Sequence, residues 1–197
     1  MNEDRAQAHA LEAIAAALLL LTSVLFALEM TAVTPLSAST SSQHIENQQQ
    51  ASAEGILATA ADSGALETAV LFWNRTAGKF HEANETAYYT SKAPPNEFGG
   101  MLERAFGEEG LAYNVEVIYV VGDQRIVQQM VNQGVPSDHA VRASRSVTLT
   151  DKTEIRDANG EPNGTAINDT SNFYVVDASP DSGVYNVVRV EVVVWRI

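Results

Sequence analysis

The chain has 197 residues, a formal net charge of −13 and no cysteine. A negative charge of this size repels phosphate backbones, so nucleic acid is not an expected partner. The lack of cysteine excludes disulfides, thiolate metal sites and lipid anchors attached to cysteine.

An apolar segment near the N-terminus predicts a membrane-spanning helix. Ala13–Leu28 holds sixteen residues without a charge, and extension to Val33 gives 21 residues with Glu29 as the only charge. At about 1.5 Å of rise per residue this segment covers about 31 Å, close to the hydrocarbon core of a bilayer. We therefore predict a short leader at residues 1–12 and a transmembrane or filament-core helix at residues 13–34.

Three interpretations of this N-terminal segment are open. A secretory signal peptide begins with a positive region, whereas Met1–His9 carries two acids and one arginine. A plain signal anchor accounts for the apolar length but not for Glu12 at its start. The third interpretation is a type IV pilin-like N-terminus, in which a short polar leader precedes a glutamate that opens a long apolar helix.

The residues favour the third interpretation through a resemblance. The stretch RAQAHALEA at Arg5–Ala13, followed by the apolar run, resembles an archaeal prepilin leader. The whole chain resembles uncharacterised haloarchaeal surface proteins, with similarity also at Ala143–Leu149 and Val192–Ile197. Many acids and few lysines agree with a halophilic source, because high salt screens repulsion between carboxylates; an acidic secreted domain is the alternative.

The resemblance implies a structural subunit of a cell-surface filament, without catalysis, cofactor or metal. Its implied partners are other pilin subunits, identical or different, the membrane and a prepilin-type peptidase. The implied location is the cell membrane, crossed once, with an extracellular C-terminal head. A glutamate at the fifth mature position places the cut after Gln7, before Ala8, whereas a mature chain that starts with glutamine is cut after Ala6.

Glu12 is the predicted assembly residue. A carboxylate at the end of an apolar helix is costly in lipid unless it is paired or close to the interface. In a filament it would meet the freed α-amino group of a neighbouring subunit and set the axial register between helices. In a simple anchor Glu12 would only mark the water boundary.

The next segment, residues 35–62, is predicted to be a separate stalk helix. Pro35 is expected to break or bend the apolar helix, since its ring opposes the carbonyl four residues earlier. Thr40 and Gln43 match a capping box. Asp62-Ser63-Gly64 is expected to end the helix.

Residues 63–197 predict an extracellular α+β head. We expect one helix at Ala65–Trp73, with a buried strand as the alternative, and a second helix capped by Asn96, whose apolar residues recur at helical spacing. Residues 76–95 predict a long loop with one short strand, and residues 151–171 a polar excursion. Alternation predicts strands at Leu111–Val121, Arg125–Val131, Ala140–Thr150, Asn172–Asp177 and Val184–Ile197. The expected fold is a long N-terminal transmembrane and stalk helix followed by an antiparallel sheet packed on one or two helices.

Four N-glycosylation sequons lie in predicted loops or at loop edges, as an outer surface decorated with glycans requires. Their asparagines are Asn74, Asn84, Asn163 and Asn168.

Other chemistry has weak support. Asp157–Asn163 alternates oxygen side chains as calcium loops do, but a hairpin tip explains it as well. His81 and His139 lack the partners of a zinc protease or a catalytic triad. The alternatives to a filament subunit are a monomeric membrane-anchored binding domain and an anchored hydrolase built around His81 or His139.

Overall fold

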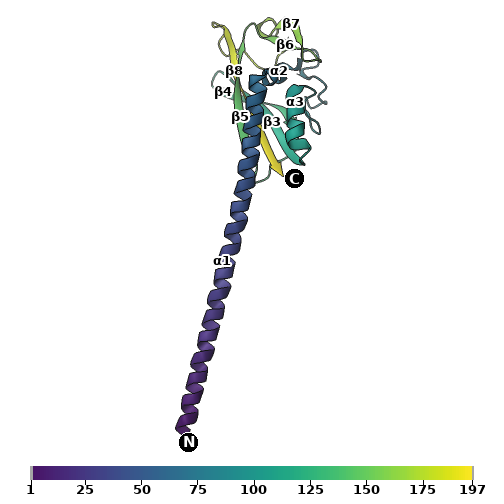
Figure 1. Cartoon of the computed structure of the whole chain (residues 1–197). Helices are drawn as coiled ribbons and strands as arrows, with labels where there is room; N and C mark the ends of the chain where they lie inside the picture. The colour runs from purple at the N-terminus through teal and green to yellow at the C-terminus, as the bar shows by residue number, and fades with distance from the viewer. Residues whose placement is uncertain (1, 197) are drawn as a thin grey trace. The chain divides into compact units, whose positions relative to one another are not determined.

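The chain has an α+β fold, as predicted: an N-terminal apolar helix precedes antiparallel sheets and a few short helices (Figure 1). In this computed structural model the backbone is described for residues 2–196, and side chains are described at Gln7, at residues 9–30 and at residues 43–196. The chain divides into two compact units, Met1–Ile45 and Glu46–Ile197, which we call the N-terminal and C-terminal units.

One helix, α1 (Asn2–Asp62), forms the described part of the N-terminal unit and also the first residues of the C-terminal unit. A break at Pro35 and a helix start at Thr40 are therefore wrong, since both residues lie inside α1, whereas a bend at Pro35 stays a prediction. A proline removes one hydrogen bond from the helical ladder, and the flanking turns of so long a helix keep theirs. The end of α1 at Asp62, before Gly64 with φ +80°, agrees with the prediction.

The main sheet has four antiparallel strands, which correspond to four of the five strands that alternation predicts. Its order is β4 (Gln124–Asn132), β3 (Leu111–Val121), β8 (Val184–Arg196) and β5 (Val141–Thr150). The valines of β8 explain its central position, because Val188, Val190, Val192 and Val194 are all buried on one face. A strand with such a face needs neighbours on both sides and a covering layer.

Helices cover that inner face of the sheet. The layer contains α2 (Ala65–Leu71), α3 (Glu97–Leu102) with its continuation as a π-helical turn at Glu103–Gly107, and the last turns of α1. They contribute Leu66, Phe98, Leu102, Phe106 and, from α1, Ala53, Leu57 and Ala60 to one hydrophobic core. The predicted packing of the sheet on helices near Leu66 and after Asn96 is thus confirmed.

The start of α3 shows how local sequence builds this layer. The Asn96 side chain accepts a hydrogen bond from the Gly99 amide at 3.0 Å, which is the predicted cap. A Cβ at Gly99 would lie 1.8 Å from the Pro94 carbonyl oxygen. Only glycine therefore lets the Pro94 loop lie against the first turn of α3.

Two short hairpins complete the C-terminal unit. β1 (Trp73–Asn74) pairs with β2 (Lys79–Phe80), and β6 (Glu154–Arg156) pairs with β7 (Pro162–Ala166), followed by a 3-10 turn at Ile167–Asp169. Trp73 is therefore in a strand beyond α2. The polar excursion contains the β6–β7 hairpin, whose turn was one of the two interpretations of Asp157–Asn163, whereas its two strands were not predicted.

The predicted strand at Asn172–Asp177 is wrong. Its alternation is real, since Phe173 and Val175 are buried. The segment is instead anchored by single contacts: the Trp73 indole donates to the Asn172 carbonyl at 2.9 Å, and the Tyr174 hydroxyl donates to the Val70 carbonyl at 2.8 Å. The alternating apolar residues of this segment therefore belong to a loop whose side chains are buried in the core, and not to a strand.

The outer face of the sheet, opposite the helices, is partly covered by the crossover at residues 133–140 that joins β4 to β5. The Asn114 side-chain amide donates to the Gly134 carbonyl at 2.9 Å and holds this crossover. Beneath it Ala112, Val193 and Trp195 form a second, small apolar cluster. Further along, the outer face stays open.

Candidate functional site

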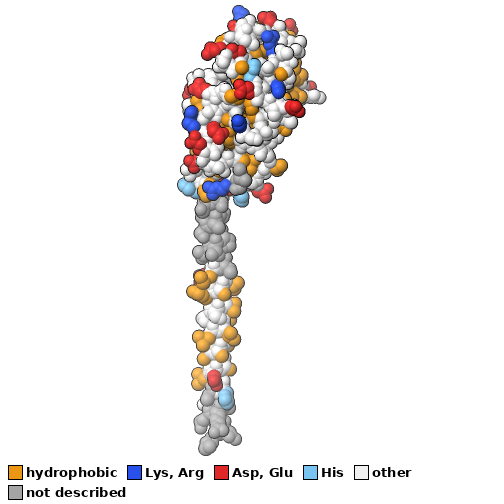
Figure 2. Space-filling view, turned by 90° about the vertical axis from the view of Figure 1, so that its right-hand side faces the viewer, with side chains coloured by type: hydrophobic (Ala, Val, Ile, Leu, Met, Phe, Trp, Pro, Cys, Tyr) orange, Lys and Arg blue, Asp and Glu red, His pale blue; other side chains and the backbone are white. Residues whose placement is uncertain are grey.

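The apolar part of α1 is the first candidate. His9–Met30, 22 residues, is long and apolar enough to cross a membrane, although a signal sequence meets the same criteria. Every side chain from His9 to Met30 is exposed, including Leu19 at 71% and Leu20 at 68%. Figure 2 shows apolar side chains along this stretch. So much exposed apolar surface marks a segment that another phase or another chain must cover.

Glu12 lies near the start of this span. Its Oε2 atom is 3.6 Å from His9 Nδ1, and both side chains are more than 80% exposed. Glu29 is exposed near the other end. Glu12 therefore remains accessible to a partner. Of the predicted processing residues, Gln7 is exposed, whereas the side chains of Ala6 and Ala8 lie outside the described residues.

The sequons differ in their surroundings. Asn84, Asn163 and Asn168 are exposed, whereas Asn74 is half-buried. The Asn74 side chain accepts hydrogen bonds from the Thr76 and Ala77 amides, both at 3.0 Å, and so shapes the β1–β2 turn. Three of the four predicted sites thus present an accessible asparagine.

The histidines do not form a catalytic arrangement among the described residues. His81 Nε2 lies 3.1 Å from the Arg156 carbonyl oxygen, and its ring packs on Phe72 at 4.9 Å between centroids. His139 Nδ1 lies 2.8 Å from Glu46 Oε1, which ties the crossover to α1. Both histidines thus make structural contacts, and no serine hydroxyl bonds to either.

The oxygen-rich stretch at Asp157–Asn163 is the turn of the β6–β7 hairpin. The Asp157 carboxylate accepts from the Asn159 amide at 2.8 Å and the Glu161 amide at 3.0 Å. These backbone hydrogen bonds lower the pKa of Asp157. The carboxylate of Asp157 thus stabilises the turn, so this stretch is a hairpin tip, which was the alternative to a calcium loop.

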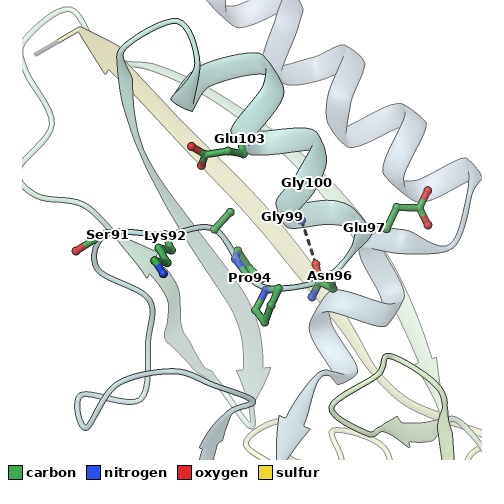
Figure 3. Close-up of a pocket in the computed structure, with 10 residues that line it drawn as sticks. Ser91, Lys92, Pro94, Asn96, Glu97, Gly99, Gly100 and Glu103 are labelled. Atoms are coloured by element: carbon green, nitrogen blue, oxygen red, sulfur yellow. Dashed lines mark hydrogen bonds between the residues drawn. The ribbon is translucent and has the colours of Figure 1, made fainter.

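A shallow pocket of about 620 Å³ lies between the loop at residues 91–97 and α3 (Figure 3). Lys92 from the loop and Glu103 from the helix supply its charges, while Glu97 points away (Figure 3). The Tyr113 hydroxyl lies 3.4 Å from Glu103 Oε2. Burial and the Glu103 charge raise the pKa of Tyr113. Sequence reasoning missed this pocket because its residues carry no motif.

Comparison with known proteins identifies a family for this chain. No curated protein and no solved structure matches the chain. A family model described as "Family of unknown function (DUF7288)" matches residues 5–194. The match covers the apolar helix and nearly all of the C-terminal unit, so the chain belongs to the DUF7288 family.

Proposed function

We propose that this chain is a pilin-like, non-catalytic structural subunit of an archaeal cell-surface filament. The observation that carries the proposal is the exposed apolar stretch His9–Met30, led by Glu12 and continuous as one helix with a segment that helps to form the C-terminal core. In the proposal this stretch crosses the membrane once and later packs against other subunits, identical or different. The C-terminal unit stays outside the cell.

Glu12 would set the register of this assembly. With His9 as its neighbour at 3.6 Å and 82% of its side chain exposed, its carboxylate is available to a second chain. A prepilin-type peptidase would free an α-amino group close to it, and that group on a neighbouring subunit would pair with the carboxylate. In an apolar filament core an unpaired carboxylate is costly, so one axial offset between helices would be favoured.

The change Glu12→Ala tests this mechanism. We expect loss of the chain from surface filaments, measured by electron microscopy with an antibody against the C-terminal unit, while the membrane-bound fraction stays the same. Glu29→Ala is the matched control, because it removes the other carboxylate of the same stretch and should leave incorporation unchanged. Unchanged incorporation of Glu12→Ala would remove the main support for a pilin-type assembly.

Mass spectrometry of the native chain tests processing and glycosylation together. We expect a mature N-terminus at Gln7 or Ala8, and glycan mass on at least two of Asn84, Asn163 and Asn168, because all three are exposed. We expect less glycan on Asn74, because it is half-buried. An intact Met1 would instead indicate a plain anchor.

The second candidate is a monomeric membrane-anchored binding domain. The pocket of about 620 Å³ with Lys92 and Glu103 favours it, since both a cation and an anion could be bound there. An intact N-terminus together with a monomeric chain in the membrane would support this candidate over a filament subunit.

A further inference from the structure

Charge is distributed unevenly in the C-terminal unit. The four strands of the main sheet carry five arginines and two glutamates, a net charge of +3. The remaining residues of the unit carry six bases and nineteen acids, a net charge of −13. On the outer face of the sheet the strands place Arg125, Arg142 and Arg189 with Glu116 and Glu191, a net charge of +1, because Arg145 and Arg196 share the register of the inner-face residues Val190 and Leu111. An outer face without net negative charge, in an otherwise acidic unit, favours contacts between unlike sides of two copies.

The outer face of the sheet bears an apolar cluster that we call the valine patch: Val120, Val127 and Val187. Their exposed fractions are 46%, 46% and 52%. In the β3–β4 pair Val127 lies opposite Ile118. In the β3–β8 pair Ile118 lies opposite Arg189, and the same register two residues further along places Val120 opposite Val187. Arg125, opposite Val120, and Arg189 flank the patch with positive charge.

The helical side of the unit has a complementary hollow, which we call the helix groove. It has a volume of about 430 Å³ and is lined by Ser52, Gly55, Ile56 and Thr59 of α1 and by Met101, Arg104 and Ala105 of the α3 region. Because both helices pack on the inner face of the sheet, the groove opens on the side opposite the valine patch. The surrounding stretch Glu97–Glu109 has four exposed acids and one arginine.

We propose that the valine patch of one copy docks into the helix groove of a second copy. The apolar side chains of the patch would cover Ile56, Met101 and Ala105, while Arg125 and Arg189 would face the acids beside the groove. The two surfaces lie on opposite sides of one unit, so the contact is head-to-tail and repeats along an open chain of subunits. The inference rests on the proposed function, which supplies the neighbouring copies.

Arg104 is the one basic residue that lines the groove, and Glu116 on the outer face is an acidic residue that could pair with it in a second copy. Glu116 lies opposite Glu191 in the β3–β8 pair, and Arg142 binds Glu191 at 3.0 Å. Among the described residues the Glu116 carboxylate makes no ion pair and no hydrogen bond. Glu116 is two residues from Ile118 on the same face of β3, so docking would bring Arg104 toward a carboxylate that otherwise faces another carboxylate.

A contact between one patch of three valines and one groove is smaller than a stable protein–protein interface, which buries about 1,200–2,000 Å². It is therefore weak between free molecules. The raised local concentration of membrane-bound or assembled subunits would compensate for this weakness. The contact must therefore be tested in the full chain in its membrane.

Disulfide trapping tests the contact directly, because the chain has no cysteine of its own. Gly55→Cys places a thiol in the groove, where a Cβ would meet no atom within 4 Å, and Val187→Cys places one in the patch. In membranes of cells that express the double variant, mild oxidation should give a ladder of dimers, trimers and longer species. A mixture of the two single variants should give dimers only.

Controls separate this contact from association through α1. Gly55→Cys combined with Asn159→Cys, at the exposed tip of the β6–β7 turn, should give no ladder. Arg189→Glu added to the trapping pair should reduce the ladder strongly, and Arg189→Lys should preserve it.

Filaments without cross-linking would overturn the docking inference and leave the proposed function intact. Cross-linked ladders without filaments would support the docking and count against the filament.

Discussion

The helix α1 contains two stretches that differ in hydrophobic content and in burial, and the two properties run in opposite directions. From His9 to Met30 it is apolar on all sides, and every one of these side chains is exposed. From Glu46 to Asp62 it is mostly polar or small, and it buries only Ala53, Leu57 and Ala60, which lie on one face. The second stretch contributes to the core of the C-terminal unit, whereas the first buries none of its side chains. Hydrophobic content alone therefore does not show which part of a helix stabilises the fold.

The largest expected difference between the two stretches concerns the membrane. Leu19→Arg with Leu20→Arg replaces two apolar residues at the middle of the span, at a cost of about 6–8 kcal/mol for insertion. We expect the chain to disappear from the membrane fraction after carbonate extraction. Asn47→Arg with Gln48→Arg, a matched pair at exposed positions of the second stretch, should stay in it. Retention of the leucine variant would show that the first stretch does not span the membrane.

The next difference concerns stability. Leu57→Ala removes a fully buried side chain from the core and should lower the free energy of unfolding of the C-terminal unit by about 2–5 kcal/mol. Leu20→Ala removes the same atoms from an exposed position and should leave that free energy unchanged. Guanidinium unfolding of the full chain in detergent, followed by tryptophan fluorescence, measures both. Equal effects of the two changes would contradict the division of α1 into two roles.

The smallest expected effect is a dependence on alkaline pH that belongs to the C-terminal unit, which holds all six tyrosines. Burial raises the pKa of Tyr174 well above 10, so above pH 10 this tyrosine ionises in the unfolded chain and stays neutral in the folded one. Stability is complete below pH 10 and should fall above it by about 1.4 kcal/mol per pH unit for this residue. Tyr174→Phe should reduce that slope between pH 10 and 11 in unfolding measurements, and an unchanged slope would exclude Tyr174 as a source.

Local patterns predicted most of the elements, for reasons that the structure makes explicit. The valine face of β8 and the Asn96 cap depend on neighbours in sequence, so spacing and residue type were enough. The break expected at Pro35 does not occur, because the hydrogen bonds of a 61-residue helix outweigh one missing donor. The segment Asn172–Asp177 was misjudged because alternation reports burial and not pairing, and its contacts with Trp73 and Val70 are distant in sequence.

The candidate sites divide in the same way. Glu12 and the sequon asparagines were identified from sequence, because short linear motifs define them. The pocket at Lys92 and Glu103, the helix groove and the valine patch were not, since each joins residues from separate elements. No local pattern indicates which side of the sheet the helices leave open.

Hydropathy and periodicity are properties of neighbouring residues, so they were enough to predict an apolar segment able to cross a membrane and an α+β domain. The continuity of α1 across both units and the strand order β4-β3-β8-β5 could be known only from the folded chain. The folded chain also decided which charges share a surface. Strand order and exposure depend on packing between distant segments, and that packing places Arg125, Arg142 and Arg189 on one face of the sheet with Glu116 and Glu191.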